Sequence, residues 1–294
     1  MSQTHFEVHQ PTSLAQALEM LSAHRSSVRV LAGGTDLVPK LKAGVLGAAH
    51  LVSLGLIPGL DAVSFTEETG LVIGPRVRLS QVGANPQARR HYPGLAHACS
   101  VMATTQIRNM GTVTGNLANA APSGDTAAPL LVYDAVLEIV GPEGRRQVPV
   151  AEFFRGPGMS VLEPVEIIEA VKLPCPPRPV GSSYQRLSAR GKVDIAAVGV
   201  AGLLALDARG KVARCRLALA AVAPTPIRCA EAEAMLEGQI PGDDLLARAA
   251  EACRAAARPI DDVRATAVYR KQMVQVLALR VLEECRAQAQ GGVA

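Results

Sequence analysis

A long stretch near the middle of the chain has the composition of a phosphate-binding segment. Residues 107–131, IRNMGTVTGNLANAAPSGDTAAPLL, contain no Lys or Glu and few bulky side chains. Such a segment cannot fill a core by itself, but its backbone N–H groups and short hydroxyls can approach a polyanionic ligand closely. We call it the second segment; its small polar residues and its carboxylate are Thr112, Thr114, Gly115, Asn116, Asn119, Ser123, Gly124 and Asp125.

A shorter stretch of the same character lies upstream. Residues 32–37, AGGTDL, directly follow the apolar run Val28–Leu31, and we call them the first segment. Their two glycines permit a tight turn with the backbone close to a ligand, and Thr35 adds a hydroxyl. Two such segments in one chain predict a dinucleotide held from two sides. Taken alone, a Gly-Gly-Thr turn is more often structural, and Asp36 and Asp125 also suit helix caps or turns.

The common nucleotide and hydrolase motifs are absent from the sequence. No G-x-G-x-x-G is present, which argues against a Rossmann fold, and Gly191-Lys192 is followed by Val193, which excludes a P-loop. No G-x-S-x-G marks an esterase, and no pair of carboxylates stands out as an acid–base couple. The chain is therefore predicted to hold a cofactor without supplying a catalytic residue, so that the cofactor does the chemistry.

Composition excludes several classes of function. The chain has 294 residues, enough for two or three compact units, and its formal net charge of +4 comes without a long Lys/Arg block. Trp is absent and aromatic residues make up 3%, so we expect no nucleic-acid partner. The longest uncharged apolar run, Ile195–Leu206, is too short for a membrane span, and Met1–Pro11 lacks the pattern of a secretory signal. We therefore expect a cytoplasmic location.

The cysteines and histidines do not form a recognisable metal motif in the sequence. The closest of the six cysteines, Cys215 and Cys229, are fourteen positions apart, and no C-x-x-C is present. Any iron–sulfur centre that works with this protein is therefore expected in another chain. His5 and His9 are four apart in a strand-like segment, where that spacing does not place two side chains together as it would in a helix. We predict no metal site.

Hydrophobic periodicity predicts an α+β protein in two parts separated by the proline cluster Pro174–Pro179. Before the cluster, we expect helices at Ser13–Ala23 and after Pro93 within Asn85–Ala103, strands at Val28–Leu31, Leu51–Leu54, Leu71–Ile73 and Glu166–Leu173, and a hairpin formed by Ala135–Val140 and Arg145–Val150. After the cluster, we expect strands at Ser183–Ser188, Ala196–Leu206 and Val212–Val222 and helices at Asp243–Ala257 and Asp262–Ala289.

Three motifs together resemble a known family. AGGTDL at residues 32–37 and the second segment are joined by a third motif, DDVRATAVYR at residues 261–270. In this order and spacing they resemble the FAD-binding medium subunit of molybdenum hydroxylases of the xanthine dehydrogenase and carbon monoxide dehydrogenase family. The third motif is similar to the C-terminal D-x-R-A-S-A-x-Y-R pattern of that family. The matches span nearly the whole chain.

The resemblance implies a fold and a domain division. Residues 1–175 would form an FAD-binding domain of the vanillyl-alcohol-oxidase (PCMH) type, in two parts of about 1–57 and 58–175, with Pro58-Gly59 between them. Residues 180–290 would form a small α+β C-terminal domain of the CO dehydrogenase flavoprotein type.

The resemblance also implies which residues hold FAD. The first segment would bind the diphosphate from one side, the start of the second segment from the other, and Asp125 falls where family members place a carboxylate on the cofactor. Residues 191–197 fall where the family approaches the isoalloxazine ring. The implied cofactor-binding residues are Ala32, Gly33, Gly34, Thr35, Asp36, Leu37, Thr112, Val113, Thr114, Gly115, Asn116, Asp125, Asp194 and Ile195.

The sequence departs from the family pattern at three positions. Thr114 stands where many relatives have Gly, Ala197 where some have Lys, and Ile195 where some have an aromatic residue. A Thr does not readily adopt a positive φ and adds bulk near the phosphate, although its hydroxyl could act as a donor.

The resemblance implies an FAD-carrying electron-transfer subunit of an oxidoreductase complex. A molybdopterin-containing large subunit would transform an organic substrate, a small subunit with [2Fe–2S] clusters would pass electrons to or from the FAD, and a terminal acceptor would exchange them with this chain. Two alternatives stay open: a cofactor-free assembly or binding module on the same fold, and a stand-alone flavin oxidase, which would need an acid–base set of its own.

Overall fold

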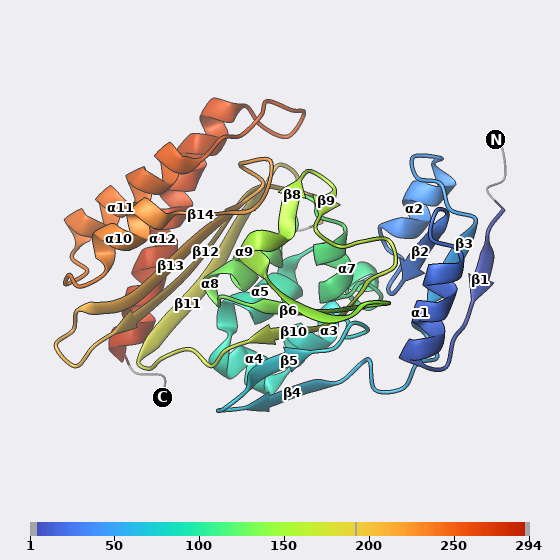
Figure 1. Ribbon diagram of the computed structural model, residues 1–294. Coiled ribbons are helices and arrows are strands. Elements are labelled where there is room, and N and C mark those ends of the chain that lie inside the picture. The colour runs from blue at the N-terminus through green and yellow to red at the C-terminus, as the bar shows by residue number, and fades with distance from the viewer. Residues whose placement is uncertain (1–4, 192, 292–294) are drawn as a thin grey trace.

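The computed structural model describes residues 5–191 and 193–291, and it has three units arranged in a row (Figure 1). A small N-terminal unit and a larger C-terminal unit lie at opposite ends, and a central unit with its own sheet lies between them. Within the described ranges, no helix combines the length and the apolar character that a membrane crossing requires.

The N-terminal unit is a parallel three-stranded sheet with helices beside it. The strands β1 (Glu7–His9), β3 (His50–Ser53) and β2 (Val28–Leu31) lie in that order. Helix α1 (Leu14–Ala23) is capped by Ser13, whose side chain accepts a hydrogen bond from the backbone N–H of Gln16. The buried face of α1 shares a small core with β2, β3 and residues of the central sheet. Helix α2 (Leu37–Lys42) starts where the first segment ends.

The central unit is an antiparallel five-stranded sheet covered by short helices. Its strand order is β4-β5-β10-β6-β7, and a two-stranded hairpin, β8-β9, lies beside it. The strands are β4 (Val63–Thr66), β5 (Gly70–Ile73), β6 (Val136–Gly141), β7 (Gly144–Pro149), β8 (Phe154–Gly156), β9 (Met159–Ser160) and β10 (Ile167–Leu173). The helices are α3 (Leu79–Ala84), α4 (Pro86–His91), α5 (Pro93–Val101), α6 (Thr105–Arg108), α7 (Val113–Ala118), α8 (Ala127–Val132) and α9 (Val150–Phe153).

The C-terminal unit is an antiparallel sheet packed between two layers of helices. Strand β12 (Ala196–Leu206) lies between β11 (Val180–Ser188) and β13 (Val212–Ala220), and the short β14 (Ile227–Arg228) is at the edge. Helices α10 (Ala230–Leu236), α11 (Asp243–Ala256) and α12 (Ala267–Gly291) cover the outer face (Figure 1). The other face packs against α5 and α8 of the central unit. Because both faces of β12 are covered, every residue of this strand is buried, which explains its uninterrupted apolar sequence.

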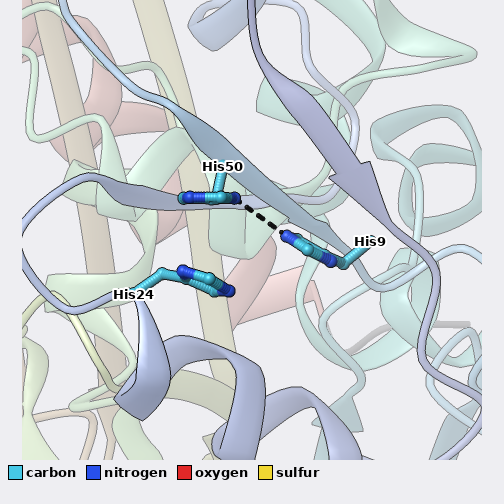
Figure 2. Close-up of side chains that lie close together, drawn as sticks. All are labelled: His9, His24 and His50. Carbon is cyan, nitrogen blue, oxygen red and sulfur yellow. Dashed lines mark hydrogen bonds between the residues drawn. The ribbon is translucent and has the colours of Figure 1, made fainter.

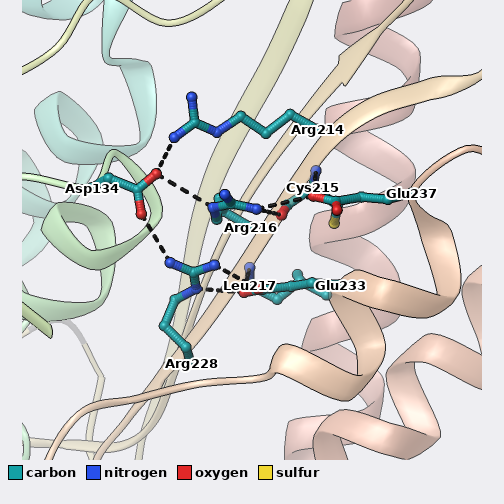
Figure 3. A network of polar contacts seen from close by, with 8 residues as sticks. All are labelled: Asp134, Arg214, Cys215, Arg216, Leu217, Arg228, Glu233 and Glu237. Atoms are coloured by element: carbon teal, nitrogen blue, oxygen red, sulfur yellow. Dashed lines mark hydrogen bonds and ion pairs between the residues drawn. The ribbon is translucent and has the colours of Figure 1, made fainter.

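An arginine cluster joins the C-terminal sheet to the central unit (Figure 3). The carboxylate of Asp134, in the turn after α8, pairs with Arg214 and Arg216 of β13 and with Arg228 of β14. Arg216 and Arg228 also pair with glutamates of the α10 region, Glu237 and Glu233. The hydrophobic core of the central unit likewise continues into the C-terminal sheet. The predicted boundary between residues 175 and 180 is therefore crossed by extensive packing.

Most predicted elements are confirmed within a few residues. The strands predicted at Val28–Leu31 and Ala196–Leu206 are observed with those bounds. The last helix was predicted to begin at Asp262, which is wrong. It begins at Ala267, because the carboxylate of Asp262 accepts the backbone N–H groups of Arg264 and Ala265 and holds that stretch in a turn. The shorter helices were not predicted: α2, α3, α4, α6, α7 (inside the second segment), α8, α9 and α10.

Candidate dinucleotide-binding site

The first segment is a tight turn that offers unpaired backbone donors. Gly34 has a φ of +72°, a conformation that favours glycine, and the chain enters α2 directly afterwards. Among the described residues, no hydrogen-bond acceptor is found for the backbone N–H groups of residues 33–37. These residues are partly or fully exposed. Buried backbone N–H groups are almost always paired, so a row of accessible, unpaired donors is suited to a bound anion.

The two segments touch through their backbones. A Cβ added to Gly33 would lie 2.2 Å from the carbonyl oxygen of Met110 and 2.9 Å from the Cα of Gly111. A Cβ added to Gly111 would lie 3.2 Å from the hydroxyl oxygen of Thr35. Any side chain at residue 33 would therefore push the first segment away from the second. Glycine is required at this position because the backbones of the two segments approach each other closely there, and the turn itself is a separate reason.

A polar clip also joins the segments. The ammonium of Lys40, in α2, donates to the Oδ1 atom of Asn119 at 2.5 Å, and the Nδ2 atom of Asn119 donates to Asp36 at 3.1 Å. Asn119 is the residue that ends α7. The clip fixes the orientation of the Asn119 amide and brings a positive charge beside the row of backbone donors. Neither residue is among the predicted cofactor-binding residues: Asn119 was noted only as a polar residue of the second segment, and Lys40 lies outside both segments.

The start of the second segment is the first turn of α7. The hydroxyl oxygen of Thr112 accepts the N–H of Gly115 at 3.0 Å, which caps the helix. The hydroxyl of Thr114 donates to the carbonyl oxygen of Pro75 at 2.8 Å. A hydroxyl has a single hydrogen, so this donor of Thr114 is already used within the protein. Thr114 lies in the helix and is not among the described residues with positive φ, so its side chain causes no backbone strain.

The rest of the second segment is held by side-chain hydrogen bonds. The Oδ1 atom of Asn116 accepts the hydroxyl of Thr126 at 2.6 Å. The carboxylate of Asp125 is only 6% exposed; it accepts the hydroxyl of Tyr184 at 2.6 Å and lies 2.9 Å from the Nε atom of Arg186. Burial raises the pKa of Asp125, while Arg186 and the Tyr184 hydroxyl oppose that shift. Burial and the nearby carboxylate raise the pKa of Tyr184 well above its usual value.

A cavity of about 280 Å³ lies where the second segment meets the C-terminal sheet. Its lining includes Pro122 and Ser123 of the second segment and Ile195 and Ala196 at the start of β12. A backbone hydrogen bond crosses this junction: the N–H of Ala221 donates to the carbonyl oxygen of Pro122 at 2.7 Å. The resemblance places residues 191–197 near the flavin ring. Lys192, within this stretch, lies outside the described residues.

The third motif contributes Asp262, Arg264 and Arg270 to the wall of the cavity. Arg270 is 3% exposed; its guanidinium donates to the carbonyl oxygens of Ala197 and Ala221 and to the carboxylate of Asp262. The backbone N–H of Arg264, followed by the guanidinium of Arg270, holds the pKa of Asp262 far below its usual value. Asp262 is the one carboxylate lining this cavity among the described residues, and as a strongly stabilised anion it is a poor base.

Asp194 is not among the residues that line this cavity. Its carboxylate accepts the guanidinium of Arg190 at 3.1 Å and the backbone N–H of Ile195 at 2.8 Å. These two contacts, with that of Arg190 the larger, lower the pKa of Asp194. Ile195 itself is 48% exposed at the cavity. The structure thus brings the first segment and the start of the second together and places Ile195 at the cavity, while Asp125 and Asp194 are engaged by arginines.

The arrangement fits a flavin dinucleotide. The unpaired backbone donors of residues 33–37, with the ammonium of Lys40 beside them, suit a diphosphate. The cavity at the far end of the second segment suits a planar group of the same ligand. Fold and site define an α+β dinucleotide-binding protein of non-Rossmann type.

Comparisons with known proteins identify the family. Residues 4–176 match the model of the FAD binding domain in molybdopterin dehydrogenase, and residues 183–285 match the model of the CO dehydrogenase flavoprotein C-terminal domain. The chain belongs to the family of FAD-binding medium subunits of xanthine dehydrogenase- and carbon monoxide dehydrogenase-type molybdenum hydroxylases. It is therefore an oxidoreductase subunit whose cofactor is FAD.

Several relatives match over nearly their whole length. The putative xanthine dehydrogenase FAD-binding subunit XdhB of Escherichia coli K12 is 34% identical over 96% of this chain and 97% of its own. The carbon monoxide dehydrogenase medium chain of Afipia carboxidovorans is 32% identical over 97% of this chain and 98% of its own. A solved structure of carbon monoxide dehydrogenase from Hydrogenophaga pseudoflava superimposes with a TM-score of 0.93 at 32% identity, covering 98% of this chain and 100% of that one.

Proposed function

We propose that this protein passes electrons between the [2Fe–2S] clusters of a small partner subunit and a terminal acceptor, while a molybdopterin-containing large subunit transforms an organic substrate. Bound FAD supplies the redox chemistry, and the protein contributes binding, orientation and shielding from water. The observation that carries the proposal is the row of unpaired backbone donors at residues 33–37, set directly against the backbone of Met110 and Gly111.

The residues of the two segments have distinct roles in this proposal. The N–H groups of the first segment would bind the diphosphate, and Lys40 would balance part of its charge. Thr112 and the first turn of α7 would close the site from the other side. Ile195 and Ser123 would border the ring system. The Asp125–Arg186 pair positions the second segment, and we assign no proton transfer to any side chain.

The surface beside the cavity supports a protein partner there. Val263, which lies in the chain between the cavity-lining residues Asp262 and Arg264, is 99% exposed. Ile260 and Ile195 also line the cavity and are 70% and 48% exposed. Isolated exposed apolar side chains are ordinary, but several around one cavity mouth suit an interface. Electrons would enter or leave on this side.

No described residue favours a stand-alone oxidase. Such an enzyme needs a base beside the flavin ring, and the carboxylate at this cavity, Asp262, is tied to Arg264 and Arg270. A cofactor-free module is also not favoured, since the donors of the first segment have no partner within the described protein.

The flavin content of the purified full chain tests the binding half of the proposal. We expect about one FAD per chain, released on denaturation. Gly33→Ala should weaken FAD binding by more than about tenfold, because its methyl group would collide with the carbonyl of Met110. Gly47→Ala is the matched control, since a Cβ there meets nothing within 4 Å. A wild-type chain that cannot take up FAD would contradict the proposal.

The metal content of the native complex tests the electron-transfer half. The complex isolated from its own cells should contain molybdenum and iron together with FAD. Addition of the oxidisable substrate should bleach the flavin absorbance only when the iron–sulfur subunit is present. If the chain contains flavin but copurifies without iron or molybdenum, the electron-transfer part of the proposal is contradicted, whereas the FAD-binding part still holds.

A further inference from the structure

Three histidines that are far apart in the sequence meet at one end of the N-terminal sheet (Figure 2). His9 is the last residue of β1, His24 is the residue that ends α1, and His50 is the first residue of β3. One nitrogen of each ring lies within 4.8 Å of the others. The prediction of no metal site rested on the spacing of the cysteines and of His5 and His9, and no sequence spacing points to this cluster.

The backbone geometry fixes the cluster. β1 and β3 are parallel, with Glu7 paired to His50 and His9 paired to Val52. Alternate residues of a strand point to the same face, so Glu7, His9 and His50 share the face on which α1 packs. His24 reaches this face from the end of α1.

The distances match those of a metal site. The Nε2 atom of His9 lies 3.1 Å from the Nδ1 atom of His50. Two nitrogens bound to one tetrahedral zinc ion, each about 2.0–2.1 Å from it, are about 3.3 Å apart. The carboxylate of Glu7 lies 3.8 Å from the Nδ1 atom of His9 and 3.7 Å from that of His50. An ion would replace the hydrogen bond that now joins His9 to His50, so these two rings must turn slightly towards it. The ring of His24 must also turn, because it is stacked on His50 with centroids 3.7 Å apart.

We propose that His9, His24 and His50 bind one divalent transition-metal ion of the zinc type, with Glu7 as the neighbouring carboxylate. Imidazole nitrogen with a carboxylate suits zinc and its neighbours, whereas magnesium and calcium prefer oxygen ligands alone. The ion fastens the edge strand β1 to α1 and β3, in the unit with the smallest hydrophobic core. It is separate from the first segment, because His50 lies beside Val28 at the start of β2, whereas the first segment leaves the other end of that strand. His9 lies further along, level with Val52, but on β1, which β3 separates from β2.

Metal uptake by the full chain, made without a histidine tag and stripped with a chelator, tests the proposal. Titration with Zn²⁺ against a coloured indicator should show one tight site per chain, and the ion should raise the unfolding temperature. His24→Ala and His50→Ala should each weaken binding by more than about 100-fold, since loss of a partner that merely orients a ligand already costs about 10–100-fold. His97→Ala is the control, as His97 is exposed on α5, outside the cluster.

Two further measurements keep the proposal falsifiable if a variant folds poorly. X-ray absorption of the zinc-loaded wild type should show three imidazole ligands, and Co²⁺ should bind without a thiolate charge-transfer band. Wild-type uptake no tighter than that of the chain with all three histidines replaced, fewer than three imidazoles, or a thiolate band from the six cysteines would overturn it. Uptake should be equal with and without FAD, so this result is independent of flavin content.

Discussion

The first and second segments have similar compositions but are anchored in different ways. The second segment runs through the large core of the central unit and is fixed by buried polar contacts, including Asp125–Arg186 and Thr114–Pro75. The first segment is partly exposed, follows a four-residue strand, and is held to the second by backbone contact and the Lys40–Asn119–Asp36 clip. The second segment is therefore preformed, and the position of the first segment depends on it. Changes to the second segment should cost stability, whereas changes to the first should cost flavin affinity.

The largest effect is expected from Arg186→Met. It leaves the buried carboxylate of Asp125 without its cation, and removing one partner of a buried ion pair costs about 3–5 kcal/mol of folding free energy. Urea unfolding at neutral pH measures this loss. Arg145→Met is the control, because the Arg145–Glu169 pair is exposed and should contribute nothing measurable. Equal stability of the two variants would show that the second segment is not anchored by this pair.

Thr114→Val should lower stability by about 1–2 kcal/mol, because it leaves the buried carbonyl of Pro75 without a donor. The flavin affinity should change by less than about twofold, since the Thr114 hydroxyl is already engaged within the protein; a tenfold change in affinity is about 1.4 kcal/mol. Thr114→Ser keeps the hydroxyl and should restore most of the stability. A large loss of flavin with unchanged stability would instead assign this hydroxyl to the cofactor.

Lys40→Met should weaken FAD binding by about tenfold, or about 1.4 kcal/mol, with little effect on the free energy of unfolding. The change removes a positive charge and opens the clip to Asn119. A fluorescence titration of the apoprotein with FAD measures the affinity. Lys42→Met, on the exposed side of the same helix, is the matched control. If Lys40→Met unfolds the protein, the first segment is structurally as important as the second.

The smallest change in stability is expected from a substitution in the third motif, at Asp262. Asp262 has a lowered pKa in the folded protein, so its charge stabilises the fold above the unfolded pKa of about 3.9, and this contribution is lost as the pH falls below that value. Asp262→Asn should therefore lower the free energy of unfolding by about 1 kcal/mol at pH 7 after solvent screening. The difference in stability between variant and wild type should become smaller towards pH 3. Urea midpoints at both pH values measure it. A difference in stability that grows as the pH falls would show that the charge of Asp262 does not stabilise the fold.

The local elements could be predicted from sequence because their signals are local. The strand at Val28–Leu31, the helix capped by Ser13 and the apolar β12 each follow from spacing within a few residues. The start of α12 could not be predicted, because a side chain, Asp262, competes for the backbone N–H groups that a helix would leave free. The hydroxyl of Thr114 could be assigned to Pro75 only once residues 39 positions apart were placed together.

The sequence by itself determined the composition of the two segments, and from their resemblance the family and the FAD cofactor, because glycines, short hydroxyls and motif order are properties of the chain alone. Only the tertiary structure decided that Gly33 meets Met110, that Lys40 reaches Asn119, that Asp125 pairs with Arg186, and that His9, His24 and His50 converge. These contacts join residues far apart in the sequence. They arise from the packing of strands and helices, which no local spacing encodes.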